Sequence, residues 1–140
     1  MAGCIARIVH SIDEVSATAW NACANPGGLI PDNPFLDHGF LHALEKSGSA
    51  ISRTGWQPFH LVLEDAAHEI LGCVPMYLKG HSRGEYVFDA AWADAWHRAG
   101  GKYYPKLQVS IPFTPATGRR LLARPGPQAR AMSSCNSTRR

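Results

Sequence analysis

Two carboxylates close together in the sequence flank an aromatic segment and are the first candidates for acid–base chemistry. Glu85 and Asp89 stand on either side of Tyr86-Val87-Phe88, and Asp94 follows shortly after. Partial burial beside aromatic side chains can raise the pKa of a carboxyl group toward neutrality, where it exchanges protons most effectively. The alternative is that Asp89 caps the helix that follows and that Glu85 is simply solvated. The pattern alone leaves both interpretations open.

A second group of polar side chains comes from Tyr103, Tyr104 and Lys106. A tyrosine hydroxyl can donate a hydrogen bond to a ligand, and a lysine ammonium can hold an anionic group. Aromatic residues beside a strand also occur simply as part of the core or its rim. We take these three residues as candidate substrate contacts.

Two histidines, His38 and His42, have the four-residue spacing that can bind zinc on a helix. On the predicted helix they lie opposite Leu36 and Phe40, and no third ligand accompanies them. We therefore predict a solvated face there and no metal site. The chain also lacks the GxGxxG and GxxxxGK[ST] patterns, which excludes Rossmann and P-loop nucleotide sites.

The elements that must position these side chains alternate along the chain. We predict, in order, a strand over 4–10, a helix opened by a capping box at Ser11 and Glu14, a helix from Asn33 to Gly48, a β-hairpin with arms 59–64 and 70–79, a helix over 90–99 and a strand over 107–113. Pro75 lies within the second arm and predicts a bulge or a sheet edge. This order predicts an α+β fold, layered in the α/β manner on a mostly antiparallel central sheet.

Apolar spacing predicts which side chains each element buries. The expected core consists of Val15, Ala19, Ala22 and Cys23 in the first helix, Leu36, Phe40, Ala43 and Leu44 in the second, Trp92 and Trp96 in the third, and Leu107, Val109, Ile111 and Phe113 along the last strand.

Cysteine usage and apolar runs indicate the compartment. The 4 cysteines include no C-x-x-C pair, which argues against a zinc ribbon or a redox dithiol and favours free thiols in a reducing cytosol. Arg7 interrupts the first apolar run, so no signal peptide is expected. No run approaches the ~20 apolar residues of a membrane helix. We predict a cytoplasmic protein without membrane insertion.

Charge is distributed unevenly along the chain. All 11 acidic residues lie within 1–94, whereas residues 95–140 carry only bases. A basic end can bind nucleic acid, although most of these bases are arginines beyond residue 118. From about Ala123 the composition turns to Arg, Pro, Ser and Ala without apolar periodicity. We predict a domain over 1–122 and a disordered basic tail over 123–140, which is either a natural terminus or a premature end.

Several stretches, taken in their order and spacing, carry a family resemblance over about residues 33–122. They are Asn33-Pro34-Phe35-Leu36, Thr54-Gly55-Trp56, His60-Leu61-Val62-Leu63, the run from Pro75 to Asp89, Trp92-Ala93-Asp94-Ala95, Tyr103 to Gln108, Pro112-Phe113-Thr114-Pro115 and Thr117-Gly118. The chain resembles FemAB-like peptidoglycan biosynthesis/recognition proteins of the GNAT acyltransferase superfamily. Members of this family are longer and carry a second GNAT-like unit, so the resemblance implies a partial GNAT-like fold and an incomplete active site.

The resemblance also implies a reaction, the transfer of an acyl or aminoacyl group to an amine, such as one on a peptidoglycan precursor. Acyl-CoA or aminoacyl-tRNA would be the donor substrate, with no tightly bound cofactor. Glu85, Asp89 or Asp94 would take the ammonium proton, with Tyr86, Tyr103, Tyr104 and Lys106 lining the substrate groove.

The donor's phosphates would lie against Thr117, Gly118 and Arg119 or Arg120, which follow the last predicted strand. A plain turn is the alternative there, because a single glycine is a weak signal. Two other functions stay open. The first alternative is a non-catalytic interaction fragment that dimerises through an open sheet edge. The second is a nucleic-acid-binding protein that uses its basic end.

Overall fold

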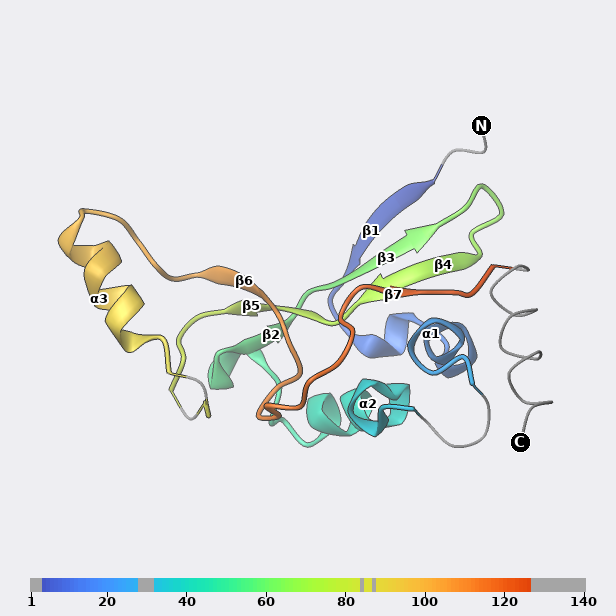
Figure 1. Cartoon of the computed structure of the whole chain (residues 1–140), viewed down its shortest axis with the longest axis horizontal. Helices are drawn as coiled ribbons and strands as arrows, with labels where there is room; N and C mark the ends of the chain where they lie inside the picture. The colour runs from blue at the N-terminus through green and yellow to red at the C-terminus, as the bar shows by residue number, and fades with distance from the viewer. Residues whose placement is uncertain (1–3, 28–31, 84, 87, 127–140) are drawn as a thin grey trace, which may run out of the picture.

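The computed structural model describes residues 4–27, 32–83, 85–86 and 88–126 and places their strands in two antiparallel sheets (Figure 1). The larger sheet has the order β1 (Ile5–Val9), β3 (His60–Glu64), β4 (Ile70–Val74) and β7 (Leu122–Ala123). The smaller sheet has the order β2 (Trp56–Pro58), β5 (Met76–Lys79) and β6 (Lys106–Val109). The predicted α+β class and antiparallel pairing are confirmed, although two sheets replace the single expected one.

The helices occupy two separate places. The helices α1 (Ala17–Ala24) and α2 (His38–Lys46) lie next to each other on one side of the larger sheet, whereas α3 (Ala90–Arg98) stands at the far end of the smaller sheet (Figure 1). Short 3-10 turns at Ile12–Glu14, Pro34–Leu36 and Ser52–Thr54 connect the elements. No helix within the described residues has the length and apolar content needed to cross a bilayer.

The predicted hairpin is bent so that it serves both sheets. Pro75 is buried and separates β4 from β5, and Phe59 separates β2 from β3 at the same level. The Phe59 N–H donates to the Met76 carbonyl (2.9 Å), which holds the two arms together through the bend. Because proline has no N–H, it interrupts the ladder where the chain passes between sheets. The strand β2 was not predicted.

The capping box at Ser11 and Glu14 is present, but it opens a 3-10 turn and not the helix that we predicted. Val15 then adopts an extended conformation, and α1 begins only after Ser16, whose hydroxyl accepts a hydrogen bond from the Ala19 N–H. The second helix is delayed in the same way. Asn33 caps the turn Pro34–Leu36, and α2 starts after Asp37. Two good capping residues therefore precede each of these helices, and tertiary packing decides which of the two begins the α-helix.

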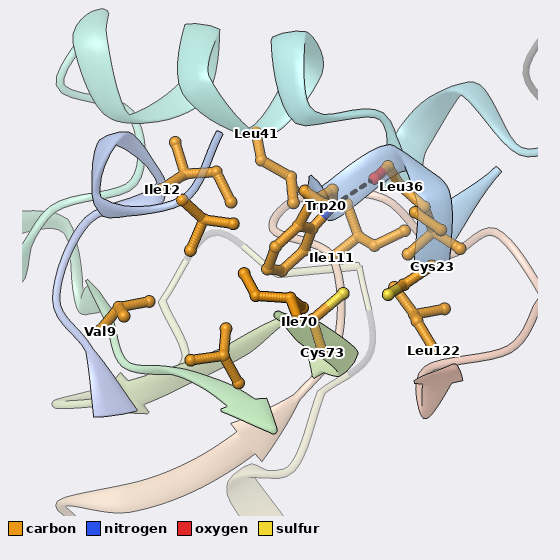
Figure 2. Packing of buried hydrophobic residues seen from close by; sticks show 13 residues of the cluster. Val9, Ile12, Trp20, Cys23, Leu36, Leu41, Ile70, Cys73, Ile111 and Leu122 are labelled. Atoms are coloured by element: carbon orange, nitrogen blue, oxygen red, sulfur yellow. Dashed lines mark hydrogen bonds between the residues drawn. The ribbon is translucent and has the colours of Figure 1, made fainter. Parts of the chain in front are cut away.

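The delayed start of α2 changes its buried face. Leu41 is fully buried although it was not predicted, whereas Ala43, predicted to be in the core, is exposed. The core packs around Trp20, which was also missed and is fully buried. The Trp20 indole N–H donates to the Leu36 carbonyl (2.9 Å; Figure 2). This bond satisfies the polar atom of the largest buried side chain and joins α1 to the entry of α2.

Four residues of the second half of the chain that were predicted to be in the core are exposed. Trp92 and Trp96 of α3 are 74% and 56% exposed, and Leu107 and Val109 of β6 are also exposed. The alternation along β6 is as predicted, but no described element covers that face of the sheet. The strand also ends at Val109, so Ile111 reaches the main core from a loop.

The predicted tail boundary at 122/123 falls within an ordered pairing. Ala123 pairs with Gly72 as part of β7, and the Arg124 N–H donates to the Leu71 carbonyl (2.9 Å). Residues 127–140, which make up the rest of the predicted tail, lie outside the described residues.

Candidate functional site

Four of the predicted site residues meet around the carboxylate of Asp89. The Tyr103 hydroxyl donates to Oδ2 (3.1 Å), the Tyr104 hydroxyl donates to Oδ1 (3.1 Å), and the Lys106 ammonium forms an ion pair with Oδ2. Asp89 stands at the N-cap position of α3, yet its side chain makes no capping hydrogen bond. The helix-capping interpretation is therefore wrong for this side chain, which reaches across to β6 and the segment before it.

Tyr104 extends the cluster to Ser82, whose hydroxyl oxygen lies 2.6 Å from the phenol oxygen. A phenol has one proton, so Tyr104 cannot donate to Ser82 and Asp89 at once. The arrangement that satisfies all three groups is a chain in which Ser82 donates to Tyr104 and Tyr104 donates to Asp89. Ser82 belongs to the loop after β5, and sequence reasoning did not single it out.

These donors determine the ionisation of the cluster. Burial by itself raises the pKa of Asp89, but the hydrogen bond from Lys106, the hydroxyl pair of Ser82 and Tyr104 and the positive charge of Lys106 outweigh it and lower the pKa to about 2. The predicted rise toward neutrality is thus not found at Asp89. Burial lowers the pKa of Lys106, but Asp89 more than compensates and the net shift is upward. At neutral pH the site holds a carboxylate and an ammonium.

A cavity of about 490 Å3 opens beside this cluster, between the loop after β5 and the first turns of α3. It is lined by His81, Ser82, Arg83, Phe88, Asp89, Ala90, Ala93, Asp94 and Tyr104. Carboxylates therefore approach it from the α3 side, and basic side chains approach it from the loop. Asp94 is exposed and makes no ion pair with any described residue, so its charge is available to a ligand.

Glu85 lies in a different place. Its carboxylate is 2.6 Å from the ammonium of Lys79, which is fully buried and 3.4 Å above the Trp56 ring. The solvated alternative for Glu85 is therefore wrong, because its side chain is only 9% exposed. Glu85 lines a second, smaller cavity of about 80 Å3 together with the exposed Tyr86.

The two ion pairs are neighbours through the sheet. Lys79 and Lys106 are register partners on β5 and β6, and like charges directly opposite each other are destabilising. Glu85 neutralises the first lysine and Asp89 neutralises the second. The sequence interpretation missed Lys79. The signal was its strand alternation with Tyr77, which places both residues on the same face, and a lysine on a buried face needs a carboxylate partner.

The predicted phosphate-binding residues lie elsewhere. Thr117, Gly118 and Arg119 are exposed, and the segment continues into β7 without a helix. The Arg120 guanidinium donates to the Ala116 carbonyl (2.5 Å), so it folds back on its own loop. The helix N-terminus that would strengthen phosphate binding is absent from this part of the described chain, and the donor site stays a prediction.

The histidine pair on α2 serves the fold. The His38 Nε2 lies 2.9 Å from the Val15 carbonyl and 3.1 Å from the Ile12 carbonyl, and the His42 Nε2 lies 3.0 Å from Asp13 Oδ1. His38 is thus half-buried and not on a solvated face. It fastens α2 to the 3-10 turn.

Comparison of the chain with models of protein families gives one match. The model of the FemAB-like family, described as peptidoglycan biosynthesis/recognition, matches residues 11–138. The chain belongs to the FemAB-like family. The match spans both ion pairs and the cavity between the 81–83 loop and α3. Neither curated proteins nor solved structures gave a significant match.

Proposed function

We propose that this FemAB-like chain holds the amine-bearing acceptor of a GNAT-type acyl or aminoacyl transfer in the cavity beside Asp89. The observation that carries the proposal is the convergence of Tyr103, Tyr104 and Lys106 on the carboxylate of Asp89, which lines that cavity together with Tyr104. The acceptor fits as an amine on a peptidoglycan precursor, in keeping with the family description.

The charges of the cavity suit a ligand with both an ammonium and an anionic group. Asp94 offers a carboxylate to the ammonium, and Asp89 keeps about one of its roughly four acceptor positions after its three bonds. Arg83 and His81 stand on the other side and can pair with a carboxylate or a phosphate. Phe88 adds an apolar side chain to the lining of the cavity.

Proton removal from the acceptor falls to Asp94, which lines the cavity and makes no ion pair with any described residue. A carboxylate with a pKa of about 2 is a weak base, since the best general bases have pKa values near the working pH. Asp89 therefore acts as a fixed negative charge that orients the ammonium. Asp94 takes the proton directly or through a water molecule.

Binding of the acceptor tests this assignment. We expect Asp89→Asn to weaken binding of an amine-bearing peptidoglycan precursor about tenfold or more, because a charge-assisted hydrogen bond contributes roughly 1.5–3 kcal/mol. Asp94→Asn is expected to have a similar effect, and acetylation of the precursor amine should abolish binding. Isothermal titration calorimetry measures all three. Glu69→Gln, which removes one exposed negative charge far from the cavity, should bind as the original chain does. Equal affinity for the free and the acetylated amine would refute the proposal.

Recognition without transfer is the second candidate function. It is favoured by the three donors that the Asp89 carboxylate already binds within the protein, which lower its pKa and make it a weak base. Mass spectrometry of the precursor after incubation with acyl-CoA or aminoacyl-tRNA separates the two functions. A mass gain on the amine indicates transfer, and tight binding with no mass gain indicates recognition alone.

We also propose that two copies associate through β6, which forms an edge of the smaller sheet. Its outer backbone groups have no ladder partner among the described residues, and Leu107 and Val109 are exposed on one face. A second copy of the same strand offers a matching row of donors, acceptors and apolar side chains.

Light scattering should therefore detect a dimer at micromolar concentration. Changing both Leu107 and Val109 to lysine should give monomers, because the charges repel across the shared edge. Leu121→Lys, at a leucine that is more exposed than Leu107 and lies outside both sheets, is the control and should stay dimeric. A strictly monomeric original chain would overturn this proposal.

A further inference from the structure

Two cysteines far apart in the sequence meet in the main core. Cys23 lies near the end of α1 and Cys73 lies within β4, and both are buried. Figure 2 shows their sulfur atoms turned toward each other where the helix packs on the sheet. Both cysteines are free. No ion pair or catalytic cluster described above uses these thiols.

We propose that Cys23 and Cys73 form a site of reversible oxidation, at which a peroxide converts the two thiols into a disulfide between α1 and β4. The geometry carries this proposal, because two facing sulfurs on adjacent elements are a prerequisite for a disulfide. The link would close a loop of about 50 residues, which contains α2 and the hairpin arm β3.

The environments of the two thiols differ in a way that assigns their roles. The adjacent Cys73 thiol and the nearby charge of Arg124 lower the pKa of Cys23, although burial opposes this shift. The adjacent Cys23 thiol and burial raise the pKa of Cys73. Cys23 is therefore the thiolate that attacks first, since the thiolate is the nucleophilic form. Cys73 is the resolving thiol.

The reaction balances with one peroxide for each disulfide. The Cys23 thiolate attacks one peroxide oxygen, the O–O bond breaks, and a sulfenic acid and hydroxide form. The Cys73 sulfur then attacks the Cys23 sulfur, so that the S–S bond forms as the S–O bond breaks. The hydroxide that leaves takes the Cys73 proton and departs as water. Two electrons pass from the two sulfurs to the peroxide.

The oxidant can reach the pair through the edge of the sheet. The strand β7 covers Cys73 through the register pair with Leu122, and this strand is only two residues long. A short edge strand opens at a much lower free-energy cost than the whole domain. Its opening would uncover both thiols while α1 and β4 stay in place.

The test uses the full chain carrying Cys4→Ser and Cys135→Ser, which leaves the buried pair as the only thiols. Hydrogen peroxide should give an intramolecular disulfide, seen as a loss of two hydrogens by mass spectrometry and as a Cys23–Cys73 cross-linked peptide without reduction. Dithiothreitol should reverse it. The oxidised form should melt at least about 5 °C higher, because the link restricts the unfolded chain.

Two further variants separate the roles of the thiols. In the same background, Cys73→Ser should accumulate a sulfenic acid at Cys23 that dimedone traps, whereas Cys23→Ser should give at least about tenfold less dimedone adduct at Cys73. If the folded double-serine protein keeps both thiols after peroxide treatment, the proposal is wrong. That outcome does not depend on whether either single-thiol variant folds.

Discussion

Replacing Glu45 by alanine is expected to lower the free energy of unfolding by about 3 kcal/mol. Glu45 lies near the end of α2 and accepts hydrogen bonds from the start of the 3-10 turn Ile12–Glu14 and from the first residue of β3. Its carboxylate accepts from the Ser11 hydroxyl (2.9 Å) and the Ile12 N–H (3.0 Å), and it lies 3.1 Å from the Nε2 of the fully buried His60. Each buried donor left without an acceptor costs roughly 1–3 kcal/mol, out of a typical total of about 5–15 kcal/mol.

The tautomer of His60 explains why this loss cannot be repaired within the protein. The Met76 N–H donates to Nδ1 (3.3 Å), so Nε2 carries the ring proton and must donate it. This pair of bonds holds the bend where β3 and β5 begin, next to Phe59 and Pro75. Without Glu45 the ring proton points at an apolar methyl group.

Urea unfolding measures this prediction against two matched variants. Glu45→Gln retains an acceptor and should lose less than half as much stability. Glu14→Ala removes a carboxylate that is 44% exposed and caps the same 3-10 turn, so it should cost about 1 kcal/mol. If Glu45→Ala and Glu14→Ala lower the free energy of unfolding by similar amounts, the buried network around Glu45 does not stabilise the fold more than an exposed cap does.

The second large effect is expected for Glu85→Gln, which leaves Lys79 buried without its counter-charge. Removing one partner of a buried ion pair typically costs about 3–5 kcal/mol. The Trp56 ring, 3.4 Å from the ammonium, offsets part of this loss through a cation–π interaction of roughly 2 kcal/mol or less. We therefore expect a loss near the lower end of the range at pH 7.

The loss should shrink as the pH rises. Burial already lowers the pKa of Lys79 below its ordinary value, and Glu85 opposes that shift. Without Glu85 the pKa of Lys79 falls further in the folded state. Between the folded and the unfolded pKa, the unfolded chain binds more protons, so stability increases with pH. Urea unfolding from pH 7 to pH 10 should show Glu85→Gln approaching the original chain.

Two controls isolate the buried charge. Changing Lys79 to Met and Glu85 to Leu together removes both charges and should restore most of the stability, because a buried ion pair is often replaceable by apolar side chains. Glu69→Gln breaks the exposed pair with Arg124 and should change stability by no more than about 1 kcal/mol at any pH tested. A pH-independent loss in Glu85→Gln would mean that Lys79 is not the cause.

Local sequence signals were sufficient to predict several of the points at which elements are capped or interrupted. The Ser11–Glu14 capping box, the Gly100-Gly101 end of α3 and the interruption at Pro75 are all present in the structure. Each of these depends on the conformational preferences of one or two residues, which act in any fold. The period-two alternation of β6 was likewise predictable, because it follows from strand geometry alone.

Only the tertiary structure decided what those elements bury and which charges meet. Alternation on β6 shows that Leu107 and Val109 share a face, but it cannot say whether another element covers that face. Packing also brings Asp89 to Lys106 and Glu85 to Lys79. From the sequence alone, Asp89 could equally have capped the helix that it precedes. Ion pairs across two strands depend on sheet register, which is set by contacts between distant segments. The family and the candidate residues were therefore within reach of the sequence, whereas their division into two adjacent ion pairs was not.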